Sequence, residues 1–320
     1  RDFTLTNSLE GIGGEYNAMD VDMNGTLVIG SGTNIIVQDG DVSNANPNAL
    51  YNYGTVTING DVLLSIENKG RVITNCGTCT IGGNADDHID ISSSSLSGSI
   101  LNFNSGILTI GTGTTVRSSA GLENYNIATI SGATLESSKT TVKNDGSGTL
   151  YISGGTVKNT DTNGSSNALV NNSTAVVSGG VITSDSSCAI WTMYKLTLEG
   201  DCQVSAPNGT SVGSNTNTKA GSEINIRGNA SVTGKTTGVE ASAATGTGGK
   251  GTSTLTITGG SIFGSSYAVK TSANTEISGG TLSASGPSIT NSFALYCSGS
   301  AMVNISGGEL IADSEEYSAY

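Results

Sequence analysis

The hexapeptide Ile152-Ser153-Gly154-Gly155-Thr156-Val157 decides the fold of this chain, because it returns almost unchanged at two later places. These are Ile277-Ser278-Gly279-Gly280-Thr281-Leu282 and Ile305-Ser306-Gly307-Gly308-Glu309-Leu310. Weaker copies share an apolar anchor residue before a turn. The twelve anchors are Ile29, Ile58, Ile81, Ile110, Ile130, Ile152, Val177, Leu198, Ile226, Ile257, Ile277 and Ile305. Their mean spacing of about 25 residues is typical of one coil of a β-solenoid, in which each repeat stacks on its neighbours.

Apolar residues alternate with polar ones on both sides of each turn. Leu27 and Leu108 stand two residues before their anchors, and Val157 follows its anchor by five residues. A period of two indicates a strand with one buried face. The glycines between two such strands indicate a corner. We predict positive φ angles at Gly154 and Gly279, because glycine adopts them without a steric penalty.

A third strand upstream of the anchors ends in a polar residue. Asparagine stands six residues before five anchors, at Asn52, Asn75, Asn104, Asn124 and Asn171. Side-chain amides stacked at the strand spacing of about 4.8 Å can bond to one another and to the turn backbone. The sequence therefore predicts a stacked asparagine ladder.

Three short strands per coil with irregular corners resemble the right-handed parallel β-helix of the pectate-lyase-like superfamily. The Ser-Gly-Gly repeats resemble those of adhesin-like bacterial surface proteins. The resemblance covers residues 18–312 and implies an all-β fold, a single right-handed parallel β-helix of about 12 coils. Residues 1–17 would form an N-terminal cap and residues 313–320 a C-terminal tail. The resemblance implies architecture rather than activity, because that superfamily contains lyases, hydrolases, phage tailspikes and binding proteins.

Composition narrows the classes of partner. The formal net charge is −13, and charged residues make up only 12% of the chain. Nucleic acid is not expected as a partner, because phosphate binding requires clustered Lys and Arg. No apolar run is long enough for a transmembrane segment. We expect the protein to be a monomer.

Five cysteines include the pair Cys76 and Cys79, which is half a zinc site. Register places no second cysteine beside Cys79 or Cys202, so we expect unpaired residues that fill the core.

The densest ionisable group is Asp86-Asp87-His88-Ile89-Asp90. The carboxylates of Asp86, Asp87 and Asp90 are candidate ligands for Ca²⁺, although no cofactor is required by the sequence. Paired carboxylates could also act as acid and base on a glycosidic bond. The competing interpretation is a solvated acidic loop.

Aromatic residues flank the ladder positions. Tyr51, Trp191 and Tyr296 precede them and should point outward, whereas Tyr53, Phe103 and Tyr125 follow them. Exposed aromatic rings on a flat sheet are suited to stacking on sugar rings, while polar side chains take the hydroxyls. The candidate ligand-binding residues are Trp191, Tyr194, Tyr151, Glu123 and Lys143. The alternative is that these are ordinary strand aromatics with high β-propensity.

These observations predict a non-catalytic, extracellular or cell-surface module, adhesin-like, that binds polysaccharide or a host glycan or serves as a surface stalk. One alternative is a polysaccharide lyase or glycoside hydrolase with its active site in the loops. A second alternative is a structural spacer alone. No catalytic residue is assigned, because basic and acidic side chains together on one face are scarce in the sequence.

Overall fold

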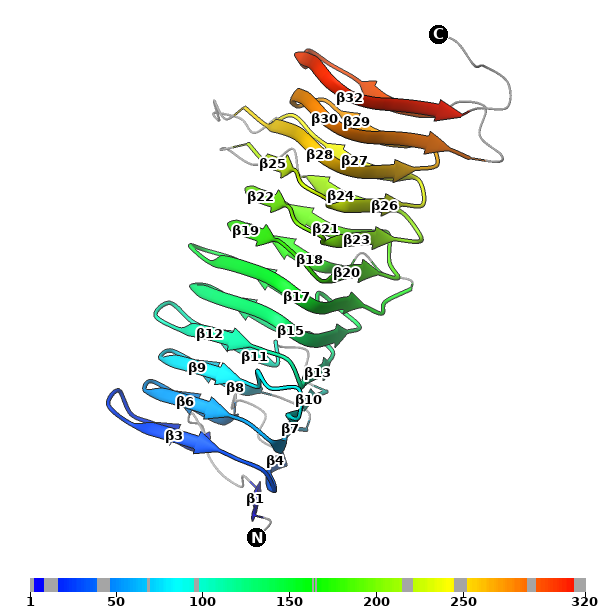
Figure 1. Cartoon of the computed structure of the whole chain (residues 1–320). Helices are drawn as coiled ribbons and strands as arrows, with labels where there is room; N and C mark the ends of the chain where they lie inside the picture. The colour runs from blue at the N-terminus through cyan, green and yellow to red at the C-terminus, as the bar shows by residue number, and fades with distance from the viewer. Residues whose placement is uncertain are drawn as a thin grey trace. The chain divides into compact units, whose positions relative to one another are not determined.

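The computed structural model describes residues 3–8, 17–38, 47–67, 70–94, 98–162, 164, 166–214, 221–244, 252–286 and 292–313. All regular elements among them are β-strands, β1 to β32 (Figure 1). The strands form a parallel β-solenoid of about 10 turns. This confirms the expected all-β parallel β-helix, and the expected number of coils was nearly right. The chain divides into two compact units, Arg1–Lys158 and Asn159–Tyr320.

The strands form two sheets, here called sheet A and sheet B. Along the first unit, each sheet B strand is followed by two short sheet A strands or by one long one. Its sheet B strands are β2 (Asn17–Val21), β5 (Asn48–Asn52), β8 (Arg71–Asn75), β11 (Ile100–Asn102), β14 (Leu122–Asn124) and β16 (Val142–Asn144). Its sheet A strands are β1 (Phe3–Ser8), β3 (Thr26–Ile29), β4 (Thr33–Gln38), β6 (Thr55–Ile58), β7 (Asp61–Ile66), β9 (Thr78–Ile81), β10 (His88–Ser93), β12 (Ile107–Ile110), β13 (Thr114–Ser118), β15 (Ile127–Ser137) and β17 (Thr149–Asn159).

The second unit repeats the same alternation. Its sheet B strands are β18 (Asn167–Asn171), β21 (Cys188–Thr192), β24 (Thr210–Ser214), β27 (Thr237–Ala241), β29 (Tyr267–Thr271) and β31 (Phe293–Cys297). Its sheet A strands are β19 (Thr174–Val177), β20 (Val181–Ser184), β22 (Lys195–Leu198), β23 (Gln203–Ala206), β25 (Glu223–Ile226), β26 (Ser231–Gly234), β28 (Thr254–Gly264), β30 (Asn274–Ser285) and β32 (Val303–Asp313).

The core of each unit consists of columns of apolar side chains, one from each coil. In sheet B of the first unit, Leu50, Ile73, Ile100 and Leu122 lie in register on successive strands and are at most 1% exposed. Burial of each such side chain stabilises the fold by about 1.5–3 kcal/mol. The apolar alternation read from the sequence therefore forms the buried inner face of these coils, whereas in β32 the anchor Ile305 is 48% exposed.

The asparagine ladder is present, but its third member is Asn102 and not Asn104. In the first unit each side-chain amide donates to the Oδ1 atom of the next asparagine at 2.8 Å, in the order Asn52, Asn75, Asn102, Asn124, Asn144. Asn104 lies exposed in a turn. That turn is two residues longer than the one after Asn75, so counting back from the anchor selected the wrong asparagine. In the second unit, Asn171 donates to the hydroxyl of Thr192 at 3.1 Å.

The corners also require a correction. Positive φ occurs at the second glycine of the Ser-Gly-Gly copies, 86° at Gly155 and 88° at Gly280, and not at Gly154 or Gly279. The strand continues through the corner in β17 and β30. Where β28 pairs with β30, the register shifts at the corner, as in a β-bulge. The glycine pair thus bends a continuous strand and does not separate two strands.

All five cysteines are free thiols; the register had predicted this for Cys79 and Cys202, and Cys297 is exposed rather than part of the core. Cys79, Cys188 and Cys202 are buried, and burial raises the pKa of Cys79 to about 12. At the N-terminal end, β1 pairs in parallel with β4 and so adds a strand to the stack. Residues 1–2 and 9–16 of the proposed cap, and residues 314–320 of the proposed tail, lie outside the described residues.

Candidate functional site

Two neighbouring columns of side chains point outward from sheet B of the first unit. In-register pairing places Asp20, Tyr51, Thr74, Leu101, Glu123 and Lys143 in one column. The other column consists of the residues that directly follow the ladder positions: Asp22, Tyr53, Cys76, Phe103, Tyr125 and Asp145. From Tyr53 onward, the backbone N–H of each donates to the carbonyl oxygen of the ladder position in the preceding coil. The stacking of coils therefore gathers side chains that are about 20–30 residues apart in sequence.

Four aromatic side chains stand in these columns, and we call Tyr51, Tyr53, Phe103 and Tyr125 the aromatic strip. The rings of Tyr51 and Tyr53 lie 5.0 Å apart between centroids, and those of Phe103 and Tyr125 lie 6.1 Å apart, edge to face. Tyr53 is 49% exposed and Phe103 is 43% exposed. The hydroxyl of Tyr53 donates to that of Tyr51 at 3.2 Å, so the two hydroxyl groups lie side by side at the surface.

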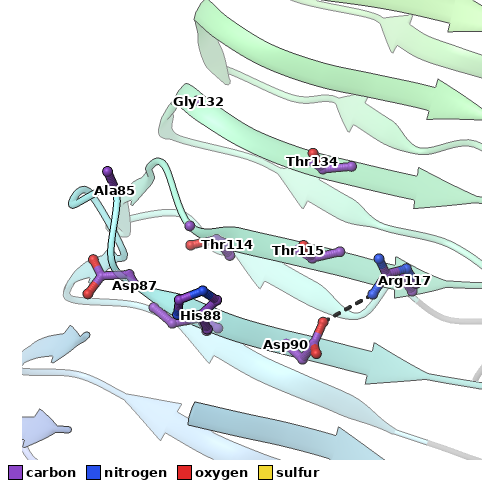
Figure 2. Close-up of a pocket in the computed structure, with 11 residues that line it drawn as sticks. Ala85, Asp87, His88, Asp90, Thr114, Thr115, Arg117, Gly132 and Thr134 are labelled. Carbon is purple, nitrogen blue, oxygen red and sulfur yellow. Dashed lines mark hydrogen bonds and ion pairs between the residues drawn. The ribbon is translucent and has the colours of Figure 1, made fainter. Parts of the chain in front are cut away.

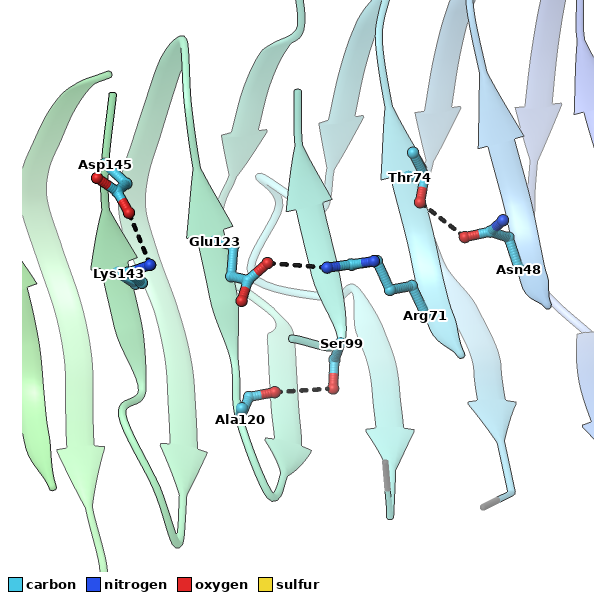
Figure 3. A network of polar contacts seen from close by, with 8 residues as sticks. All are labelled: Asn48, Arg71, Thr74, Ser99, Ala120, Glu123, Lys143 and Asp145. Carbon is cyan, nitrogen blue, oxygen red and sulfur yellow. Dashed lines mark hydrogen bonds and ion pairs between the residues drawn. The ribbon is translucent and has the colours of Figure 1, made fainter. Parts of the chain in front are cut away.

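Charged residues lie beside the aromatic strip, and the structure pairs them. The guanidinium of Arg71 on β8 reaches past β11 to the carboxylate of Glu123 on β14, at 2.9 Å (Figure 3). Lys143 contacts Asp145 at 2.6 Å, and that hydrogen bond raises the pKa of Lys143. Both cations are thus held by carboxylates of the same face.

The outward face of sheet A in the same coils has a different chemistry. On β3, β6, β9, β12 and the first half of β15, its outward residues are all β-branched and uncharged: Thr26, Val28, Thr55, Thr57, Thr78, Thr80, Ile107, Thr109, Ile127 and Thr129. Such side chains are stiff and suit a pleated surface. The other sheet A strands of these coils carry charged outward residues as well, among them Asp61, Asp90 and Arg117. In these coils the aromatic rings are therefore confined to sheet B.

Sheet B of the second unit carries a second group of aromatic residues. Tyr267 and Phe293 stack with centroids 5.7 Å apart, and Tyr296 lies 5.4 Å from Tyr267. Phe293 is 36% exposed and Tyr296 is 38% exposed. Trp191 lies over the strand next to it, because a Cβ atom at Gly213 would come within 2.8 Å of its ring.

The five residues predicted to bind a ligand do not all share one face. Glu123 and Lys143 flank the aromatic strip. Tyr151 belongs to β17 of sheet A and is 45% exposed, so its grouping with Glu123 was wrong. Trp191 lies on β21 of the second unit, and Tyr194 follows in the next turn. Tyr53, Phe103 and Tyr125 were not selected. The places of Tyr53 and Tyr125 directly after Asn52 and Asn124 were visible in the sequence, whereas that of Phe103 became clear only once the structure made Asn102 the ladder residue.

The carboxylate of Asp87 has a structural role in the loop before β10. It accepts hydrogen bonds from the backbone N–H groups of Gly60 at 2.7 Å and Asn84 at 2.9 Å. These bonds hold the pKa of Asp87 below its usual value. Asp90 instead pairs with Arg117 at 3.1 Å (Figure 2). The two carboxylates therefore face different partners.

The same loop borders a depression of about 410 Å³ on sheet A. His88 contacts Asp61 at 3.1 Å, and Asp86 is exposed. Among the residues that the structure describes, no group of three or more His, Cys, Asp or Glu side chains is arranged to hold a metal ion. The observed contacts fit loop stabilisation by Asp87 and a cross-strand pair at Asp90.

A mixed-charge groove of about 350 Å³ lies on sheet A of the second unit. Lys195 contacts Glu223 at 3.1 Å, and Arg227 donates to Glu199 at 2.6 Å. A hydrogen bond from Asn225 lowers the pKa of Glu223, so this carboxylate is poorly suited to act as a general acid. The groove does bring acidic and basic side chains together on one face, which the sequence analysis did not anticipate.

No protein-family model, curated protein or solved structure matches the chain. In the part of the chain that is described, no helix has the length and apolar character to cross a membrane. Functional inference therefore depends on the faces of the solenoid themselves.

Proposed function

We propose that this protein is a non-catalytic carbohydrate-binding module of the cell surface or extracellular space, and that its ligand lies on the aromatic strip. The observation that carries the proposal is the concentration of Tyr51, Tyr53, Phe103 and Tyr125 on sheet B of the first unit. The sheet A strands that follow the ladder turns in the same coils, β3, β6, β9, β12 and the first half of β15, present only β-branched side chains.

The strip combines the two features that sugar recognition requires. Ring faces of Tyr53 and Phe103 are open to solvent and offer apolar area to the C–H face of a pyranose. Glu123, Lys143 and the hydroxyl of Tyr51 lie beside them as partners for sugar hydroxyl groups. Rings supplied by several successive coils are suited to a polysaccharide chain, whose ends need not enter a pocket.

An enzyme of the polysaccharide lyase or glycoside hydrolase class is the second candidate. The observation in its favour is the mixed-charge groove, with Lys195, Glu223 and Arg227 on one sheet face. Lys195 there is paired with Glu223, and Arg227 is paired with Glu199. Because these ion pairs keep both cations and both carboxylates charged, neither pair offers a neutral base or a protonated acid for catalysis. Binding is therefore the better-supported function.

Native gel electrophoresis with a polysaccharide in the gel tests the proposal. We expect retarded migration in at least one gel, with the polysaccharide intact after staining. The double variant Tyr53→Ala/Phe103→Ala should migrate as in a gel without polysaccharide. Tyr151→Ala is the matched control, because it removes an equally exposed tyrosine from sheet A.

Three results would contradict binding at the strip. A cleared track would mean catalysis and would direct attention to the mixed-charge groove. Retardation that survives the double variant would place the ligand elsewhere. Unretarded migration in every gel would favour the spacer. Parallel gels with Ca²⁺ and with a chelator show whether the cation contributes.

A further inference from the structure

We infer that the ligand of the aromatic strip is a neutral, extended β-1,4-linked polysaccharide such as xylan or a β-glucan, bound across the strands. This inference rests on the proposed function and specifies the chemistry of that site. Three properties of the strip carry it: its direction, its straightness and its charge.

The direction follows from which coils supply the rings. Tyr53 follows β5, Phe103 follows β11 and Tyr125 follows β14, so the rings span three coil steps, about 14 Å at the usual strand spacing. Along any one strand the strip is only two outward residues wide, about 7 Å. A chain laid along a strand would contact the aromatics of one coil. A chain laid across the strands contacts all of them.

The straightness of the strip selects the shape of the chain. The sheet B pairings from β2 to β16 keep one register, so the outward columns run without a lateral step. A polysaccharide with β-1,4 links between equatorial positions is an extended ribbon, and successive rings present apolar C–H faces to the same support. A helical α-1,4-glucan curves away from a straight support after a few residues.

The charge of the strip selects a neutral chain. Carboxylates flank it at both ends, with Asp20 and Asp22 at one end and Glu123 and Asp145 at the other. The two neighbouring cations, Arg71 and Lys143, are engaged by Glu123 and Asp145. Within a Debye length of about 8 Å at physiological salt, a uronate polymer would meet the negative charges of Asp20 and Asp22, which form no ion pair with any of the described residues. Polyanions are thereby disfavoured.

Affinity gels with four probes test the class of ligand: hydroxyethylcellulose, neutral xylan, soluble amylose and polygalacturonate. We expect retardation by hydroxyethylcellulose or xylan and unretarded migration with the other two. Retardation by amylose or polygalacturonate alone would overturn the inference and leave carbohydrate binding intact. No retardation by any polysaccharide would overturn both.

Titration calorimetry with xylo- or cello-oligosaccharides of increasing length tests the direction. Affinity should rise with length until the oligosaccharide spans the strip and then level off. Phe103→Ala should lower the affinity for the longest oligosaccharide by about 2- to 10-fold, which corresponds to the loss of one aromatic contact. Tyr151→Ala should leave this affinity unchanged. Equal affinity for a monosaccharide and the longest oligosaccharide would contradict a chain laid across the coils.

A charge variant tests the exclusion of polyanions without removing an aromatic ring. Asp22 is exposed at the end of the strip, and Asp22→Lys reverses the charge there. The variant should gain retardation by polygalacturonate and keep its retardation by the neutral polymer. Polygalacturonate retardation equal in the wild-type protein and the variant would show that charge does not select the ligand.

Discussion

The Nδ2 atom of Asn75 donates to the Oδ1 atom of Asn102 at 2.8 Å, although the two residues stand at different distances from their anchors. Asn75 precedes Ile81 by six residues, whereas Asn102 precedes Ile110 by eight. The extra two residues lie in the turn that contains Asn104. Stacking therefore aligns the coils by the ladder amides and lets the turn absorb the difference in length.

The first prediction concerns this ladder. Asn102 is fully buried, and its amide group also donates to the carbonyl oxygens of Gly106 and Ile127. Asn102→Ala should lower the free energy of unfolding by about 1–3 kcal/mol, the cost of leaving buried polar groups unsatisfied. Asn104→Ala, in the exposed turn, should change it by less than about 0.5 kcal/mol. Chemical denaturation of both variants measures the difference. Equal losses of unfolding free energy in the two variants would show that Asn102 is not the ladder residue that stabilises the fold.

The second prediction concerns the corner glycines. A Cβ atom at Gly155 would lie 2.1 Å from the carbonyl oxygen of Ala133, and the φ angle there is 86°. Gly155→Ala should therefore cost at least about 1–3 kcal/mol. At Gly154 the nearest atom, the carbonyl oxygen of Ser131, would be at an ordinary 3.4 Å. Gly154→Ala should be neutral or slightly stabilising. Thermal unfolding compares the pair, and a larger loss for Gly154→Ala would refute the assignment of the strained glycine.

The third prediction concerns pH and Asp87. Its hydrogen bonds from Gly60 and Asn84 lower its pKa in the folded state. Their contribution to stability is present above the unfolded pKa, near 4, and is lost as pH falls through the folded value. Asp87→Asn should therefore reduce the melting temperature at pH 7, and the gap to wild type should narrow as pH falls below about 4. Asp86→Asn is the control, because Asp86 is exposed. A gap independent of pH would exclude the ionised carboxylate as its source.

The fourth prediction concerns thiol reactivity. Burial raises the pKa of Cys79 and of Cys188 to about 12, whereas Cys297 is exposed. Because the thiolate is the reactive form, alkylation of the folded protein at pH 8 should modify Cys297 first and leave Cys79 and Cys188 unmodified. Unfolding in denaturant should then release both for reaction. Mass spectrometry of the peptides identifies the sites, and early modification of Cys79 would mean that the core opens easily.

The sequence was sufficient for the architecture because a parallel solenoid repeats its chemistry once per coil. Ile58, Ile81 and Ile110 are anchors in the sequence and are fully buried in the structure. Local patterns of period two carry this information, and each coil repeats it independently. The same register predicted that Cys79 and Cys202 have no cysteine neighbour, and both are free thiols.

Counting along the chain failed wherever a turn changed length. Asn104 was chosen in place of Asn102 because spacing from an anchor ignores two inserted residues. Gly154 was chosen in place of Gly155 because a bulge changes which of two adjacent glycines carries the positive φ angle. Neither difference is visible in residue types alone.

The sequence by itself determined the parallel coils, their buried columns and the outward positions of aromatic residues such as Tyr51. Only the tertiary structure decided which outward residues meet. It placed Tyr151 on sheet A, brought Phe103 and Tyr125 edge to face, and engaged Glu123 with Arg71 two coils away. The physical reason is that burial within a coil is a local property of alternation, whereas a face is assembled from residues of successive coils and depends on the length of every intervening turn.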